Sequence, residues 1–192
     1  MLKGTMPFEL QPHLENELVK LVPLKVNDFE SLYQVASDPL IWEQHPDRYR
    51  YKRDIFEKYF DDAIQSGGAF LVVEKESGKP IGSSRFYDFN EEKKSIAIGY
   101  TFLARKYWGT TYNRAMKILM LDHAFKFVDT VIFHIGAMNI RSQKATEILG
   151  AWKVGEIEIN YPGEDERLNF IYEMDKSKWT KIHDRLANEP AK

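Results

Sequence analysis

The sequence predicts one α/β domain built on a mixed α+β sheet of about seven strands, with helices on both faces. Three strand-like runs separated by short turns indicate an antiparallel meander. The third of them, a long helix over 110–128 and a strand over 131–136 form a βαβ unit, which requires parallel strands and a right-handed crossover. With 43% hydrophobic residues, a chain of 192 residues can bury one sizeable core.

Two helices are expected after a first strand over 18–24. Asn27 followed by Glu30 resembles a capping box, which would open a helix through Ala36, and the Asp38-Pro39 pair would end that helix. Over 54–64 the apolar residues recur at helical spacing, and a glycine pair follows. The first part of the chain therefore predicts strand, helix, helix.

The meander comprises strands over 69–74, 80–89 and 95–103. Short polar turns with glycine or asparagine join them. In the third strand, large apolar residues alternate with small ones, which predicts one face packed on helices. The large residues of that face are Ile96, Ile98, Tyr100 and Phe102.

The second half alternates helices and strands. The helix over 110–128 is apolar around much of its circumference and is expected to lie against the sheet, with Ala115, Ile118, Leu121, Phe125 and Val128 on one stripe. A strand over 131–136, a helix over 140–149 and strands near 152–159 and 167–174 follow. A hairpin turn at Tyr161-Pro162-Gly163 is expected to join the last two strands. The tail beyond Lys176 is expected to be peripheral, and no repeat or linker divides the single domain over 1–192.

Composition excludes several classes of function. Because 27 basic and 29 acidic residues nearly cancel, no overall field would hold nucleic acid or an acidic membrane surface. The absence of cysteine excludes disulfides, thiolate nucleophiles and cysteine-ligated metals, and no metal site is predicted. No apolar run is long enough to span a membrane. The expected location is the cytoplasm, and the expected assembly is a monomer or a homodimer.

The turn over 105–113 has the chemistry of an anion site. It joins the third meander strand to the long helix, whose first amides are unpaired donors. Gly109 permits close approach of the backbone, and Arg105 and Lys106 add positive charge. An ordinary strand-to-helix loop with threonine caps explains the same residues. Neither a nucleotide-triphosphate P-loop nor a G-x-G-x-x-G motif is present.

A family resemblance favours the anion site. Ile98-Gly99-Tyr100 leading to Tyr107-Trp108-Gly109, then Asn139-Ile140-Arg141-Ser142 and Leu149-Gly150-Ala151, look like the GNAT superfamily of N-acetyltransferases. Within it the chain resembles the RimJ/RimL-like branch, which includes the N-terminal acetyltransferases of ribosomal proteins. The resemblance covers about residues 17–175 and implies the GNAT acyl-CoA N-acyltransferase fold, with acetyl-CoA as the acetyl donor.

The resemblance also implies which residues bind coenzyme A. The family motif Gln/Arg-x-x-Gly-x-Gly/Ala binds pyrophosphate, and Lys106, Gly109 and Thr111 stand at its three defining positions, of which only Gly109 matches. Asn139 and Ser142 also have the spacing of a simple helix cap. The residues expected to bind coenzyme A are Phe102, Leu103, Lys106, Trp108, Gly109, Thr110, Thr111, Tyr112, Asn139, Ser142 and Lys144.

Catalytic roles follow the resemblance only in part. Ser142 is the candidate for protonating the thiolate that leaves. The general base is open, because Ala97 and Tyr161 stand where relatives carry glutamates, and Glu158 and Glu164 are close in sequence. His134 could relay protons, although a lone histidine in an apolar strand is more often a core residue.

The acceptor groove is expected to involve four residues: Trp42, Glu43, Arg85 and Tyr87. The loop over 41–49 is expected to border this groove. Glu43 and Asp47 would suit a cationic amine and Trp42 could offer a cation–π face, although Trp42 could equally fill the core. The acceptor is an amine of a small molecule, a peptide N-terminus or an antibiotic. A catalytically silent acyl-CoA-binding or sensor module is the alternative, and an unrelated phosphate-binding domain is a third.

Overall fold

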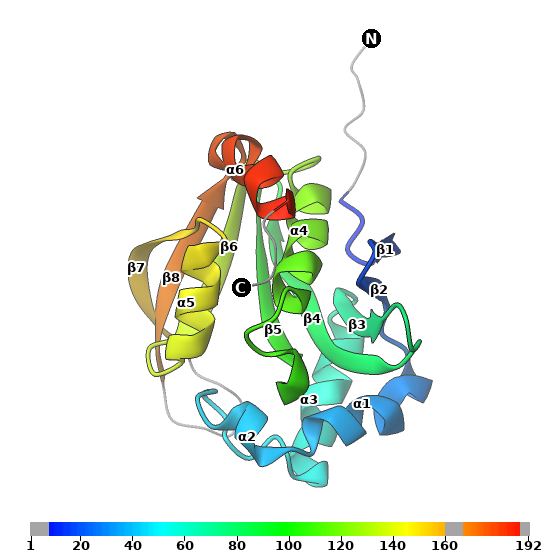
Figure 1. The fold of residues 1–192 in the computed structure, drawn as a ribbon. Helices are drawn as coiled ribbons and strands as arrows, with labels where there is room; N and C mark the ends of the chain where they lie inside the picture. The colour runs from blue at the N-terminus through cyan, green and yellow to red at the C-terminus, as the bar shows by residue number, and fades with distance from the viewer. Residues whose placement is uncertain (1–7, 160–166, 189–192) are drawn as a thin grey trace.

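The computed structural model describes residues 8–159 and 167–188, and Figure 1 shows how their helices and strands are arranged. The strands are β1 (Leu14–Glu15), β2 (Val19–Pro23), β3 (Ala69–Glu74), β4 (Pro80–Asn90), β5 (Ser95–Leu103), β6 (Thr130–Gly136), β7 (Trp152–Ile159) and β8 (Arg167–Asp175). The helices are α1 (Phe29–Ala36), α2 (Pro39–Trp42), α3 (Arg53–Gln65), α4 (Tyr112–Ala124), α5 (Ile140–Ile148) and α6 (Lys176–Asn188), with 3-10 turns at Val26–Asp28 and Arg105–Tyr107.

The strands form one mixed sheet in the order β1-β2-β3-β4-β5-β6-β8-β7. All neighbours are antiparallel except β5 and β6, which are parallel and joined through α4. The expected mixed sheet and βαβ unit are therefore confirmed. The described residues hold eight strands rather than about seven, because the two-residue strand β1 pairs with β2.

The parallel pair β5–β6 is short. It comprises three register pairs, Ser95 with Thr130, Ile96 with Val131 and Ala97 with Ile132. Beyond them β5 continues to Leu103 along β4, and β6 continues to Gly136 along β8. The two strands therefore part in the middle of the sheet.

A β-bulge interrupts β5 at Tyr100. This residue has a φ of 51°, and the register with β4 shifts between Ser83 and Arg85 opposite it. A bulge inserts one residue and so reverses the two-residue alternation beyond it. Ile98 therefore packs in one core and Phe102 in the other. The expected continuous apolar face through Tyr100 and Phe102 is wrong for this reason.

Helices cover both faces of the sheet, as expected (Figure 1). On one face, α4 and α6 bury the larger core, with Met116, Met120 and Trp179 inside it. On the other face, α1, α2 and α3 enclose a second core around Phe56 and Trp42. No described helix has the length and apolar character needed to cross a membrane.

The predicted start of the first helix differs from the structure, and its predicted end is confirmed. Asn27 and Glu30 do not form the capping box: α1 begins at Phe29, and the Asp28 carboxylate accepts a hydrogen bond from the Lys25 amide at 2.8 Å. α1 ends at Ala36 as expected, and Asp38-Pro39 also begins α2, because the Asp38 side chain accepts from the amide of Leu40 at 3.0 Å.

The second half also differs in detail. The long helix is confined to Tyr112–Ala124, and its buried face is centred on Met116 and Met120. Residues 176–188 are not a peripheral tail, because α6 buries Trp179 and Leu186 in the larger core. The expected turn at 161–163, with Tyr161 and Glu164, lies outside the described residues.

Candidate functional site

A cavity of about 600 Å³ opens where β5 and β6 part. Residues 98–103 of β5 form one wall and residues 133–136 of β6 form the other. Further lining residues come from the turn before α4, the first turn of α5 and the loop after α2, and from α4, β4 and β7. The site is thus positioned by the interrupted pairing of two central strands.

The facing edges of the two strands can bind an extended chain. Beyond Ala97 and Ile132, no ladder pairs β5 with β6 in the described structure. Backbone N–H and C=O groups need partners, and an exposed strand edge binds an extended, amide-bearing ligand as an added strand. The pantetheine arm of coenzyme A, the cofactor expected from the sequence, has this chemistry.

The turn before α4 has the geometry of an anion cradle. Gly109 has a φ of 68°, and a Cβ added there would meet no protein atom within 4 Å. The Thr110 hydroxyl donates to the carbonyl of Tyr107 at 2.6 Å, and the Thr111 side chain makes no capping hydrogen bond. The Tyr112 amide donates to the Thr110 hydroxyl at 3.4 Å, and Thr111 caps none of the amides at the start of α4, which leaves other amides of this turn for a phosphate.

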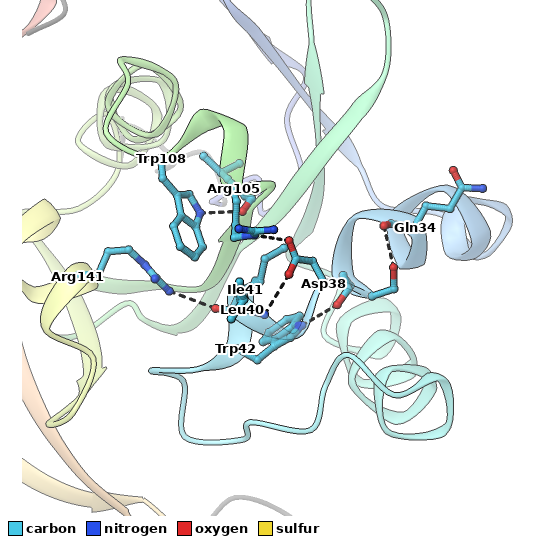
Figure 2. A network of polar contacts seen from close by, with 11 residues as sticks. Gln34, Asp38, Leu40, Ile41, Trp42, Arg105, Trp108 and Arg141 are labelled. Carbon is cyan, nitrogen blue, oxygen red and sulfur yellow. Dashed lines mark hydrogen bonds and ion pairs between the residues drawn. The ribbon is translucent and has the colours of Figure 1, made fainter.

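Side chains of three segments meet beside this cradle (Figure 2). The Trp108 indole donates to the carbonyl of Leu103 at 3.0 Å, and the Arg141 guanidinium lies 3.6 Å from the centre of its ring system. Arg141 also donates to the carbonyl of Ile41 at 3.1 Å. Arg105 forms an ion pair with Asp38, so its charge is partly matched before any ligand binds.

Asn139 and Ser142 shape the start of α5. The Asn139 side chain accepts from the Ser142 amide at 3.1 Å, so the capping interpretation is confirmed. Ser142 lines the cavity, and in the described part of the chain no residue accepts or donates a hydrogen bond at its hydroxyl. That hydroxyl is available to a ligand.

Lys117 of α4 is a buried lysine on the cavity wall. Its Nζ donates to Thr101 Oγ1 at 2.7 Å and to Ser84 Oγ at 3.2 Å, and the side chain is nearly inaccessible. Burial lowers the pKa of Lys117 to about 7, because desolvation disfavours the ammonium form. A substantial share of these lysines is therefore neutral at pH 7.

Tyr87 and His134 meet on the opposite side of the sheet. The Tyr87 hydroxyl is 3.0 Å from His134 Nδ1, and both side chains line the cavity. Burial lowers the pKa of His134, and the nearby Asp88 opposes that effect. Above about pH 6.5 the imidazole is consequently neutral and can accept a proton. Gly99 makes room for this pair, because a Cβ there would lie 2.9 Å from the Tyr87 ring.

The structure brings together some of the predicted site residues and not others. The cavity is lined by Tyr87, Phe102, Leu103, Trp108, Gly109, Asn139 and Ser142. Thr110, Thr111 and Tyr112 form the adjoining turn. Lys106 and Lys144 are exposed, as is Glu43. None of these six is among the lining residues that the structure describes.

Trp42 and Arg85 also lie behind the cavity wall. Trp42 is buried, donates to the carbonyl of Ala36 at 2.7 Å and packs on Phe102, so it fills the core and presents no open ring to a ligand. Arg85 stacks on Tyr100, with its Cζ 4.1 Å from the ring centre. The expected cation–π face of Trp42 is instead covered from within by Arg50.

Sequence reasoning missed Arg50 and Lys117, and it included His45 only as a member of the loop over 41–49; all three line the cavity. Lys117 is a charged residue at a core position of an apolar helix, and this violation of the helical pattern was the available signal. No local pattern marks His45 or Arg50. Among the described residues, no group of three or more His, Asp or Glu side chains could hold a metal ion.

Comparison with known proteins identifies the fold. The family model described as the acetyltransferase (GNAT) domain matches residues 19–151. A GCN5-related N-acetyltransferase from Brucella melitensis has a TM-score of 0.83 at 19% identity, covering 94% of this chain and 86% of that one. A GNAT-family acetyltransferase from Bacillus anthracis has a TM-score of 0.71 at 16% identity, covering 86% and 99%.

A third solved structure carries a ligand. Mycobacterium smegmatis RimJ in complex with CoA-disulfide has a TM-score of 0.65 at 14% identity, covering 87% of this chain and 88% of that one. At these identities the likeness extends to the fold alone. No curated protein matches the chain.

Proposed function

The chain belongs to the GNAT acetyltransferase family, and from that premise we propose that it transfers the acetyl group of acetyl-CoA to a primary amine. The observation that carries this proposal is the cavity at the parting of β5 and β6, which opens beside the start of α4. The start of α4 can then bind a pyrophosphate, and the cavity between β5 and β6 can bind an extended acyl-bearing arm.

We propose that the cofactor is bound chiefly through the backbone. The turn over Gly109, Thr110, Thr111 and Tyr112 would supply amides to the pyrophosphate, with Lys106 beside it. Phe102, Leu103 and Asn139 would bind the arm from the two sides of the slot, and Trp108 would form its wall. Lys144, exposed on α5, would reach outer phosphate groups.

Acetyl-CoA supplies an acetyl thioester, and the chain's residues would manage the protons. His134 is the candidate base: its neutral imidazole is oriented by Tyr87 and lies on the cavity wall. It would accept a proton from the attacking amine, directly or through water. Ser142 would donate a proton to the departing thiolate, because its hydroxyl faces the cavity at the start of α5. Proton transfers of this kind contribute roughly 10²–10⁴-fold to rate.

The acceptor would be an amine of a small molecule, a peptide N-terminus or an antibiotic, and membership of the RimJ/RimL-like branch remains a proposal. We also propose that residues 1–192 form one domain, that the protein is a monomer or homodimer and that it works in the cytoplasm. The alternative, a silent acyl-CoA sensor, is favoured by Ala97, which stands at the position of a glutamate in some relatives.

The first experiment separates binding from turnover. Thiol release from acetyl-CoA with an amine panel is expected for the wild type, and Ser142→Ala is expected to lower kcat with little change in the Kd for coenzyme A. A chain that binds coenzyme A but releases no thiol with any amine would be a sensor. Equal losses in kcat and affinity for Ser142→Ala would contradict the role of Ser142.

A matched pair of glycine variants tests the cradle. Gly109 and Gly78 have φ values of 68° and 67°, and an added Cβ meets no protein atom within 4 Å at either position. Gly109→Ala and Gly78→Ala therefore carry the same backbone cost of about 1 kcal/mol. Only Gly109→Ala is expected to weaken coenzyme A binding, by tenfold or more in calorimetry. Equal Kd values for the two variants would refute the cradle.

A further inference from the structure

Arg50 presents a largely unmatched guanidinium to the cavity. The side chain is buried, lines the cavity next to His45 and Pro46, and stacks on the Tyr59 ring with its Cζ 4.9 Å from the centre. Its ion-pair partner within residues 8–159 and 167–188 is Asp47, whose Oδ2 lies 3.5 Å from Nε. A guanidinium has five N–H donors, so this single contact leaves the fork of Arg50 free for another anion.

Arg85 is a second buried guanidinium near the same place. It is 5% exposed, and its Nε and Nη2 have no hydrogen-bond partner in the described chain. Tyr100 lies 4.1 Å from its Cζ and Tyr59 lies 5.9 Å away, but ring faces do not replace hydrogen bonds. Buried donors without partners are costly, and their presence calls for a compensating interaction.

One aromatic ring links the two arginines, of which only Arg50 is among the lining residues that the structure describes. Tyr59 contacts both guanidinium groups, and its hydroxyl donates to the carbonyl of Tyr100, the bulge residue on the cavity wall, at 2.8 Å. His45, on the same wall, is neutral: burial and then the charges of Arg50 and Arg141 lower its pKa to about 3. Among the described residues, Asp47 is the ion-pair partner of Arg50, and Arg85 has no ion pair.

Other carboxylates do not balance this charge. Asp88 and Glu158 line the cavity but are exposed, and neither is ion-paired with Arg50 or Arg85 in the part of the chain that the structure describes. Glu43, expected to attract a cationic amine, is exposed and does not line the cavity. The wall that holds Arg50 therefore favours an anion over a cation.

We propose that the acceptor amine carries an anionic group, a carboxylate or a phosphate, which Arg50 binds at the cavity wall while Arg85 adds positive charge behind Tyr100. The proposal rests on acetyl transfer as the function of the same site. A desolvated guanidinium binds either anion through two parallel N–H bonds, which neutral or cationic amines cannot accept. Amines with an adjacent acid group would then be preferred over polyamines.

The test uses pairs of amines that differ only in the acid group. Amino acids are compared with their decarboxylated amines, and O-phosphoethanolamine with ethanolamine, by kcat/KM for thiol release. The acidic member is expected to react on the order of tenfold to a hundredfold better, as for a hydrogen bond to a charged group. The two sets of pairs distinguish a carboxylate from a phosphate.

Two variants and a control assign the preference. Arg50→Met is expected to reduce the acid preference by tenfold or more, and Arg85→Met by a smaller factor. The second variant replaces unpaired buried donors with an apolar chain of similar length, which proteins tolerate. Arg48→Met, an exposed arginine of the same loop, is expected to retain the preference. An unchanged preference in Arg50→Met, or equal reactivity within every pair, overturns the proposal.

An equilibrium measurement separates this proposal from acetyl transfer itself. The N-acetylated forms of each pair are titrated against the coenzyme A complex by calorimetry, which needs no turnover. Tighter binding of the acidic form that Arg50→Met weakens supports an anionic acceptor. This result would hold even if no thiol were released, and the absence of thiol release would then refute acetyl transfer alone. Equal or absent binding throughout, with thiol release intact, refutes the anionic acceptor alone.

Discussion

Replacing Lys117 with methionine is expected to stabilise the protein near neutral pH, and to do so less as the pH rises. Lys117 is buried with Ser84 and Thr101 as its partners, and these two hydroxyls also lie 2.8 Å from each other. Methionine has a similar length and no charge, and the Ser84–Thr101 hydrogen bond can persist without the lysine. The variant therefore removes a buried amine without leaving either hydroxyl unpaired.

The magnitude follows from the lowered pKa. A change from 10.5 to about 7 corresponds to about 5 kcal/mol at 1.36 kcal/mol per unit. The two hydrogen bonds of Nζ offset about 1–3 kcal/mol of this, which leaves a net gain of about 2–4 kcal/mol for Lys117→Met at pH 6. Below pH 7 Lys117 is mostly protonated in both the folded and the unfolded wild-type chain. The folded chain therefore bears the full cost of burying the ammonium group there.

The pH dependence has a definite sign. Between pH 7 and 10.5 the unfolded chain keeps a proton that the folded chain has released, so wild-type stability rises with pH. The stability difference between Lys117→Met and wild type is expected to shrink by about 2–3 kcal/mol from pH 7.5 to 9.5. Urea unfolding at several pH values measures it, with the exposed Lys126→Met as control. A difference that does not change with pH would refute the reasoning.

Two further predictions concern the site and the core. His134→Phe is expected to lower kcat/KM by about 10²–10⁴-fold and to remove the acidic limb of its pH profile. That limb lies below pH 6.5 because burial lowers the pKa of His134. An unchanged limb would exclude His134 as the base. Trp179→Ala is expected to cost about 3–5 kcal/mol of unfolding free energy in urea titrations, against less than about 0.5 kcal/mol for the exposed Ile148→Ala. A loss below about 1 kcal/mol would mean that α6 does not stabilise the core.

The sequence was sufficient for the order of most elements, because alternation and helical periodicity are local properties. The bulge at Tyr100 was not predictable, since a left-handed φ in a residue other than glycine leaves no local signature. α6 was missed although Trp179 and Leu186 are spaced seven residues apart on one helical face. Its burial depends on contact with α4, far away in the chain.

Some residues of the candidate site could likewise be predicted from the sequence and others could not. Gly109, Asn139 and Ser142 could be found because turns and caps have local patterns. Arg50 and Arg85 come from segments 35 residues apart in numbering, and they meet only through the ring of Tyr59. The charge on each wall of the cavity therefore depends on contacts between segments that are distant in the sequence.

The three register pairs between β5 and β6 also bear on how the enzyme can evolve. Strands β1–β5 form one continuous ladder and β6, β8 and β7 form another, so the halves can splay at this seam without breaking hydrogen bonds in either. Small repacking beneath the seam would change the width of the slot. Selectivity for acyl chains longer than acetyl could thus shift through distant core substitutions, while every residue that touches the thioester stays the same.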